Sequence, residues 1–103
     1  MIYQIKITDQ ANQDLRNIFE YIAYELHEVQ IAAGQLDRLE NEIYGLNEMP
    51  ERYRVYDREP WRSRNLHIMP VDNYLVFYVP DKHTQTVSVI RVLYGRRDID
   101  AQL

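Results

Sequence analysis

The stretch that decides the fold is YLVFYV at residues 74–79, together with VSVIRVLY at residues 87–94. Both segments are rich in β-branched and aromatic residues, which favour strands, and a short polar turn separates them. A third apolar run at residues 66–71 leads into the same region through a turn at Asp72-Asn73. The three runs predict an antiparallel meander of three strands.

Upstream of the meander, the chain changes period. A strand is predicted over residues 2–8, where apolar and polar side chains alternate from Tyr3 onward. Apolar residues then recur at three- and four-residue spacing over residues 11–26 and again over residues 32–46. These patterns predict two helices, and the short connection between them indicates an antiparallel helical hairpin.

The order strand, helix, helix, strand, strand, strand predicts a single α+β domain over residues 1–103. We expect an antiparallel sheet of about four strands with the two-helix hairpin on one face. Both faces of the last two strands carry apolar side chains, whereas two helices can cover only one face. A partner protein is therefore expected on the other face, with the C-terminal residues or a second copy of the chain as alternative covers.

Composition narrows the class of protein. The chain has no cysteine, which excludes a disulfide framework and a thiol nucleophile and fits a reducing compartment. It has no apolar run long enough to span a membrane, and residues 1–8 lack the features of a secretory signal, so we expect a cytoplasmic protein without membrane contact. His27, His67 and His83 are scattered, and no metal-binding or phosphate-binding motif is present. No metal and no cofactor are expected.

Charge is distributed unevenly along the chain. Residues 1–50 contain nine acidic and three basic residues, whereas residues 51–103 contain seven acidic and nine basic residues. Eight of those nine basic residues are arginine, whose planar fork suits phosphate or carboxylate. The second half is therefore the candidate working surface, although an ordinary solvated charged surface explains the same composition.

An arginine and tyrosine constellation is the best chemical candidate in this half. Metal-free RNA cleavage needs cations that stabilise charge on the phosphate, together with groups that accept and donate protons. Arginine suits the first role; Tyr94, His67 or Glu51 could move protons, and their spacing does not choose among them. If the chain is a ribonuclease, the candidate catalytic residues are Arg64, Arg91, Tyr94 and Arg97.

The same residue types also make good anchors in protein interfaces, where no catalysis is involved. This second interpretation assigns to the binding of a partner or target protein the residues Tyr74, Tyr78, Arg91, Tyr94, Arg96 and Arg97.

The motifs occur in a familiar order. The segment IKIT at residues 5–8, followed by an apolar helix pattern with Asp14-Leu15, resembles the first strand and helix of the RelE/ParE superfamily of bacterial toxins. The segment MPER at residues 49–52 resembles the end of that family's second helix. NYLVFY at residues 73–78 and VIRVLYGRRD at residues 89–98 resemble its last two strands and terminal motif. The resemblance extends over nearly the whole chain.

This resemblance implies the toxin of a type II toxin–antitoxin system, with a β-α-α-β-β-β fold. The implied partner is a cognate antitoxin that holds the toxin inactive, and the two can form a higher-order hetero-oligomer. In the RelE-like branch such toxins cut mRNA on the ribosome without metal. In the ParE-like branch they inhibit DNA gyrase and are not nucleases.

The details favour the ParE-like branch slightly. RelE-like nucleases typically carry an arginine directly after the tyrosine of the penultimate strand, and here that position is Leu75. The terminal segment at residues 91–98 resembles the ParE-like pattern, with Tyr94 in place of a histidine. The nuclease alternative stays open because Arg64 or Arg97 could replace the missing cation. A member that binds its partner but inhibits nothing is the third hypothesis.

Overall fold

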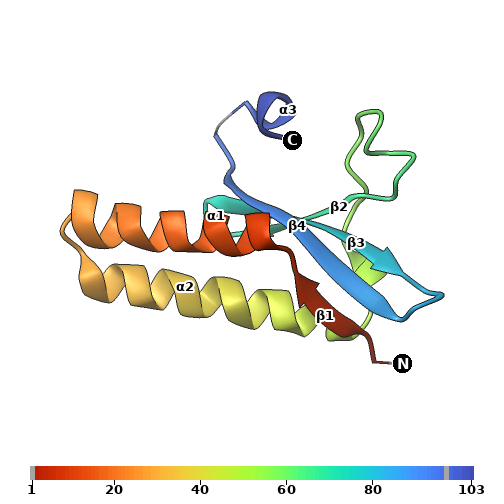
Figure 1. Cartoon of the computed structure of the whole chain (residues 1–103), viewed down its shortest axis with the longest axis horizontal. Coiled ribbons are helices and arrows are strands. Elements are labelled where there is room, and N and C mark those ends of the chain that lie inside the picture. Colours follow the sequence, from red (N-terminus) through yellow and green to blue (C-terminus); the bar gives the residue numbers. More distant parts are fainter. Residues whose placement is uncertain (1, 97) are drawn as a thin grey trace.

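The computed structural model describes residues 2–96 and 98–103 and consists of a helical hairpin packed on a four-stranded sheet (Figure 1). The elements in chain order are β1 Gln4–Ile7, α1 Asp9–Glu20, the π-helix η1 Tyr21–Glu25, α2 Val29–Tyr44, the 3₁₀ turns η2 Gly45–Asn47 and η3 Pro50–Arg52, β2 His67–Val71, β3 Tyr74–Asp81, β4 Thr86–Tyr94 and α3 Ile99–Gln102.

The strands lie in the order β1-β4-β3-β2. The β2–β3 and β3–β4 pairs are antiparallel, as the meander requires, whereas β1 runs parallel to β4 with Ile7 opposite Val89. The predicted α+β class and element order are confirmed, and the sheet is mixed rather than wholly antiparallel. The parallel pair is possible because most of the chain lies between these two strands, so no tight turn fixes their relative direction.

The helical hairpin covers one face of the sheet (Figure 1). Thr8 caps α1: its hydroxyl oxygen accepts a hydrogen bond from the amide of Ala11 at 3.2 Å. Apolar residues of α1 and α2 meet those of the sheet in the main core, whose fully buried members include Leu39, Ile43, Val76 and Tyr78. Two helices with one apolar stripe each therefore bury only this face.

The opposite face is also covered, but by the chain itself. Leu66, Phe77 and Leu93 are buried there. Two segments pack over them: Tyr56 and Trp61 belong to residues 53–65, which we call the irregular segment, and Ile99 and Leu103 to the C-terminal end. The expectation that a partner must cover this face is wrong, and the C-terminal alternative holds in part. The segment at residues 53–65 has no periodicity and α3 has only four residues, so neither predicted a covering layer.

Within the described residues, no helix combines the length and the apolar character needed to cross a membrane.

Candidate functional site

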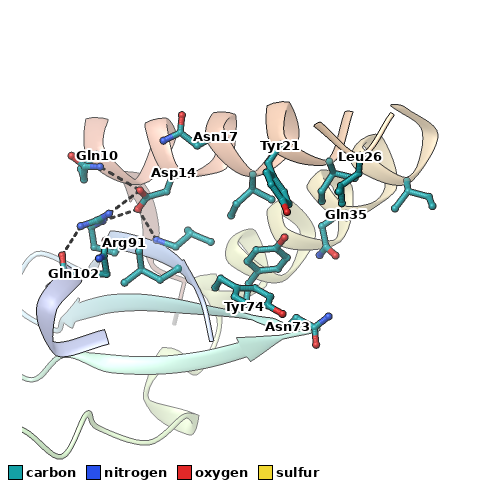
Figure 2. Close-up of a pocket in the computed structure, with 16 residues that line it drawn as sticks. Gln10, Asp14, Asn17, Tyr21, Leu26, Gln35, Asn73, Tyr74, Arg91 and Gln102 are labelled. Atoms are coloured by element: carbon teal, nitrogen blue, oxygen red, sulfur yellow. Dashed lines mark hydrogen bonds and ion pairs between the residues drawn. The ribbon is translucent and has the colours of Figure 1, made fainter. Parts of the chain in front are cut away.

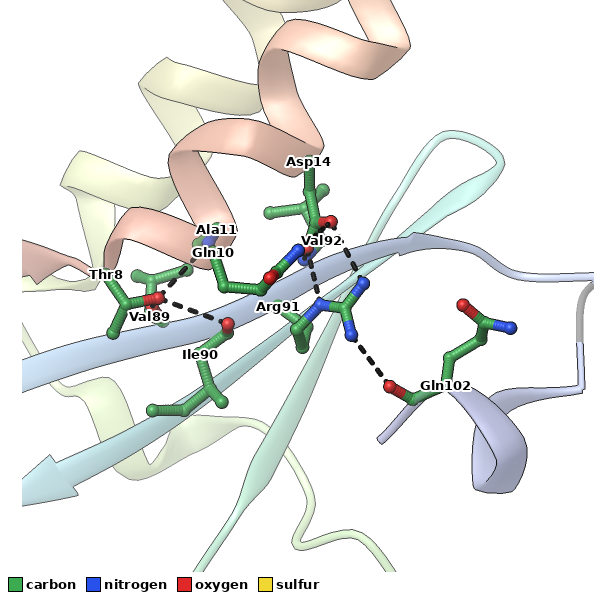
Figure 3. A network of polar contacts seen from close by, with 9 residues as sticks. All are labelled: Thr8, Gln10, Ala11, Asp14, Val89, Ile90, Arg91, Val92 and Gln102. Carbon is green, nitrogen blue, oxygen red and sulfur yellow. Dashed lines mark hydrogen bonds and ion pairs between the residues drawn. The ribbon is translucent and has the colours of Figure 1, made fainter.

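A buried ion pair joins α1 to the end of β4 (Figure 3). The guanidinium of Arg91 donates from Nε to Oδ2 of Asp14 at 2.8 Å and from Nη2 to Oδ1 at 3.0 Å. Nη1 of Arg91 donates to the backbone oxygen of Gln102 at 2.7 Å. Asp14 also accepts from the backbone amide of Val92 at 2.9 Å. We call Asp14, Arg91 and the carbonyl of Gln102 the clamp.

The position of Asp14 follows from the edge that β4 presents. β1 pairs with β4 only as far as Val89, so the backbone beyond that point lacks a neighbouring strand on this side. The hydroxyl of Thr8 donates a hydrogen bond to the carbonyl of Val89 at 2.8 Å, and the carboxylate of Asp14 accepts a hydrogen bond from the backbone amide of Val92. Helix α1 thereby satisfies strand groups that would otherwise be unpaired.

The electrostatics of the clamp are those of a structural pair. The side chain of Asp14 is 6% exposed and that of Arg91 is 19% exposed. The hydrogen bonds from Arg91 to Asp14 raise the pKa of the guanidinium, and burial opposes this effect only in part. Each nitrogen of the guanidinium has an acceptor within the protein, so Arg91 is held in one orientation by Asp14 and Gln102.

Beside the clamp lies a groove of about 950 Å³ (Figure 2). α1 and η1 form one wall with Asn17, Tyr21 and Leu26. The ends of β3 and β4 form the other wall, where Tyr74 and Tyr94 pack edge to face with ring centroids 5.7 Å apart. Both apolar and polar side chains line this groove, which suits contact with a peptide or protein segment.

A second ion pair joins the turn between β2 and β3 to α2. The carboxylate of Asp72, in the β2–β3 turn, accepts from Nε of Arg38 and from Nε2 of Gln35, both at 2.9 Å. The hydrogen bonds from Arg38 and then from Gln35 hold the pKa of Asp72 below its ordinary value of 3.8. Gln35 also lines the groove, so this contact positions one of its walls.

The structure brings together only some of the predicted site residues. Tyr74, Arg91 and Tyr94 all line the groove. Arg96 is exposed just past β4. Arg64 lies outside the groove lining and places its guanidinium 5.3 Å from the ring centre of Trp61. Arg97 lies outside the described residues.

Tyr78 needs a correction of its place. The residue is fully buried in the main core; its hydroxyl donates to the carbonyl of Pro50 at 2.6 Å, and its ring stacks on His67. Burial raises the pKa of this hydroxyl. The alternating pattern of β3 puts Tyr78 beneath the helices, and not on a binding surface, because it belongs to the face that packs on them.

Sequence reasoning missed two contributors to this site, Asp14 and the carbonyl of Gln102. A signal for Asp14 was available, since it falls on the apolar stripe of the first helix, three residues after Ala11 and four before Ile18. A carboxylate at a buried position needs a partner. The contact of Gln102 uses a backbone atom, and the sequence gives no signal for such a contact.

The described residues bring no group of three histidine, aspartate or glutamate side chains together as metal ligands.

Comparison with solved structures places the fold among bacterial toxins. The chain is similar to the chromosomal ParDE system of P. aeruginosa, with a TM-score of 0.73, 12% identity and coverage of 90% of this chain and 96% of that one. It is similar to the RelBE2 toxin–antitoxin complex of Mycobacterium tuberculosis, with a TM-score of 0.66, 20% identity and coverage of 91% and 99%. It is also similar to a mutant of the E. coli toxin RelE in the free state, with a TM-score of 0.65, 13% identity and coverage of 99% and 93%.

These similarities establish the fold, which ParDE and RelBE toxins share, and so do not choose between their targets. Among curated proteins, no relative matches the sequence. The family model for the ParE toxin of the type II toxin–antitoxin system parDE matches residues 5–99. Because that match spans nearly the whole chain, the chain belongs to the ParE toxin family and is the toxin type of a type II toxin–antitoxin system.

Proposed function

We propose that this toxin inhibits growth in the cytoplasm by binding DNA gyrase, and that a cognate antitoxin binds it and holds it inactive. The observation that carries the choice of target is the clamp: Arg91, the candidate catalytic arginine that lines the groove, is hydrogen-bonded to Asp14 and Gln102.

The remaining members of the nuclease constellation support the same choice. A metal-free nuclease needs cations and proton-transfer groups converging on one phosphate. Tyr94 lines the groove, but Arg64 does not, and Leu75 packs in the second apolar cluster, at the position where the nuclease branch typically has an arginine. Among the described residues that line the groove, the one arginine is paired with Asp14, and such a groove is better suited to binding a protein than to cleaving RNA.

The antitoxin is part of the same proposal. The groove has a volume of about 950 Å³ and is lined by Tyr74 and Tyr94, and so suits an extended or helical protein segment. Toxin and antitoxin then form a hetero-oligomer in which this groove is occupied.

The target is tested by two assays on the same protein. Purified toxin is added to DNA gyrase and relaxed plasmid, and supercoiling is followed on gels; we expect inhibition that rises with toxin concentration. In parallel, mRNA from cells expressing the toxin is mapped by primer extension, and we expect no new cleavage ends. Intact supercoiling together with new ends in mRNA would establish the nuclease alternative.

A matched pair of variants, compared by their inhibition of growth, adds a third test. Tyr94→Phe keeps the ring that packs on Tyr74 but removes the hydroxyl that a nuclease would use for proton transfer. Arg64→Gln removes the exposed cation that a nuclease could use. If gyrase is the target, both variants inhibit growth as the parent does, and loss of growth inhibition in both would contradict the proposal.

A further inference from the structure

The free end of the helical hairpin carries an unusual concentration of exposed apolar side chains. We define the hairpin tip as residues 20–31, the end of the hairpin that extends beyond the sheet (Figure 1). Five large apolar residues there are more than half exposed: Tyr21 at 56%, Tyr24 at 64%, Leu26 at 51%, Val29 at 57% and Ile31 at 56%.

Such a concentration is rare on a chain that works alone. The described residues contain nine exposed large hydrophobic side chains, and more than half of these lie within the hairpin tip. Isolated exposed apolar residues need no explanation, whereas contiguous ones mark interaction sites. The tip is therefore a candidate docking surface.

The charges around these residues have one sign. Glu20, Glu25 and Glu28 are all exposed in the tip, and residues 17–37 contain no lysine or arginine. A segment that exposes carboxylates together with apolar and tyrosine side chains is complementary to a protein surface that combines basic and apolar side chains.

The backbone of the tip is also irregular. α1 continues into the π-helix η1 Tyr21–Glu25, and His27 adopts a left-handed conformation with φ of 56°. π-Helical turns and left-handed non-glycine residues cost free energy and are found preferentially at functional sites. This irregular turn presents Tyr21, Tyr24 and Leu26 to solvent.

We propose that the hairpin tip is the surface through which this toxin docks on its target, a basic protein surface of the kind that binds DNA. The inference rests on the proposed function and adds which side of the toxin meets gyrase. An enzyme that holds DNA must present lysine and arginine to phosphates. The acidic tip is complementary to such a surface.

The same charges weigh against two other occupants. Nucleic acid is repelled by Glu20, Glu25 and Glu28, so the tip does not bind DNA or RNA directly. Two tips from two copies of this chain would oppose these carboxylates without any balancing cation, so a symmetric dimer through this surface is disfavoured.

The test compares tip variants with matched variants at the other end of the hairpin, all in the gyrase supercoiling assay. Tyr24→Ser removes an exposed ring from the tip; Tyr44→Ser removes a ring that is 53% exposed at the end of α2. We expect Tyr24→Ser to raise the toxin concentration for half-inhibition by about tenfold, since exposed aromatic rings are frequent anchors of protein interfaces. Tyr44→Ser is expected to act as the parent does.

A charge-reversal pair tests the carboxylates of the hairpin tip in the same way. Glu20→Lys with Glu25→Lys changes the tip. Glu20 is the last residue of α1 and Glu25 the last residue of η1, where a cation is favoured by the helix dipole, so the fold is retained. Glu42→Lys with Glu48→Lys changes the net charge equally at the other end. Only the first pair should weaken inhibition, and circular dichroism confirms that each variant is folded.

The outcomes separate the two proposals. If the parent toxin leaves gyrase active, the proposed function fails and the tip loses its assigned target. If the parent inhibits gyrase and both tip variants inhibit it equally well, the docking inference is overturned while the proposed function stands. Equal weakening by tip and control variants would also overturn it, because the effect would then follow net charge or lost side chains and not location.

Discussion

Asp14 illustrates how one buried carboxylate can organise a site. It sits on the apolar face of α1 with 6% of its side chain exposed and receives three hydrogen bonds from Arg91 and Val92. The ion pair is largely shielded from solvent, so each charge is stabilised mainly by the other. Losing one partner is then more costly than losing both.

Replacement of Arg91 by alanine should therefore reduce stability strongly. Arg91→Ala leaves Asp14 as an uncompensated buried charge, and we expect the free energy of unfolding to fall by about 3–5 kcal/mol. Urea titration followed by circular dichroism measures the change. The double variant Asp14→Ala with Arg91→Ala should lose less than the sum of the two single changes. Strict additivity would contradict a direct pair.

Asp72 provides a pH-dependent contribution at the residue scale. Its pKa is lower in the folded protein than its ordinary value of 3.8, so the charged carboxylate is favoured by folding. This contribution is fully present above that value and disappears as the pH falls through the lowered folded pKa. We expect Asp72→Asn to flatten the loss of stability in acid, measured as urea midpoints between about pH 6 and about pH 2.5. Asparagine also tolerates the left-handed backbone of this turn, where φ is 54°. An unchanged acid profile would contradict the assignment.

At the scale of elements, α3 is small but has several attachments. Ile99 and Leu103 pack on the second apolar cluster. The carboxylate of Asp100 accepts a hydrogen bond from the hydroxyl of Tyr56 and forms an ion pair with Arg58 at 3.3 Å. Partial burial, followed by the hydrogen bond to Asp100 and its charge, raises the pKa of Tyr56 to about 12. The irregular segment and α3 therefore hold each other on the sheet.

Removal of residues 99–103 should expose the second apolar cluster. We expect a lower melting temperature, by several degrees, and increased binding of a hydrophobic dye, since Phe77 and Leu93 lose part of their cover. Ala101→Ser, at an exposed position of the same helix, serves as the control and should change neither reading. Identical melting of the truncated and parent chains would show that α3 does not stabilise this face.

The sequence allowed the regular elements to be predicted because each one has a period. The alternation near Tyr3 and the helical stripe through Leu39 are local signals, and the structure places both residues in the main core. The cover over Phe77 could not be predicted, because Trp61 and Leu103 reach it from segments without periodicity. Tyr94 ends β4 and lines the groove, whereas Tyr78 follows Tyr74 on β3 and is buried in the main core. Tyr78 was misplaced because both faces of β3 are apolar.

At the scale of the whole molecule, charge is separated along the chain. The helical hairpin is mostly acidic, and the cations concentrate in the second half, while the net charge is −4. In the irregular segment, Arg62 lies 3.9 Å from Asp57, and both side chains are exposed. Its arginine therefore stays accessible to solvent although it is part of an ion pair. Such a molecule is attracted to different surfaces at its two ends.

The net charge leads to a prediction about nucleic acid. We expect the isolated toxin to bind a short DNA or RNA duplex only weakly, with a dissociation constant above about 10⁻⁴ M at physiological salt, since few phosphates can be neutralised. Fluorescence anisotropy with a labelled duplex measures this affinity. Tight binding that persists in high salt would contradict it and would favour the nuclease alternative.

The parallel pairing of β1 with β4 has a consequence for synthesis. β1 and α1 leave the ribosome first, but the strand they pair with is among the last to be made. Until β4 emerges, Asp14 lacks its partner Arg91 and the groove lacks one of its walls, and contacts between such distant segments form slowly. Translation that stops before β4 therefore yields a product without a clamp or a groove. A cell thus has an interval between starting this toxin and possessing it.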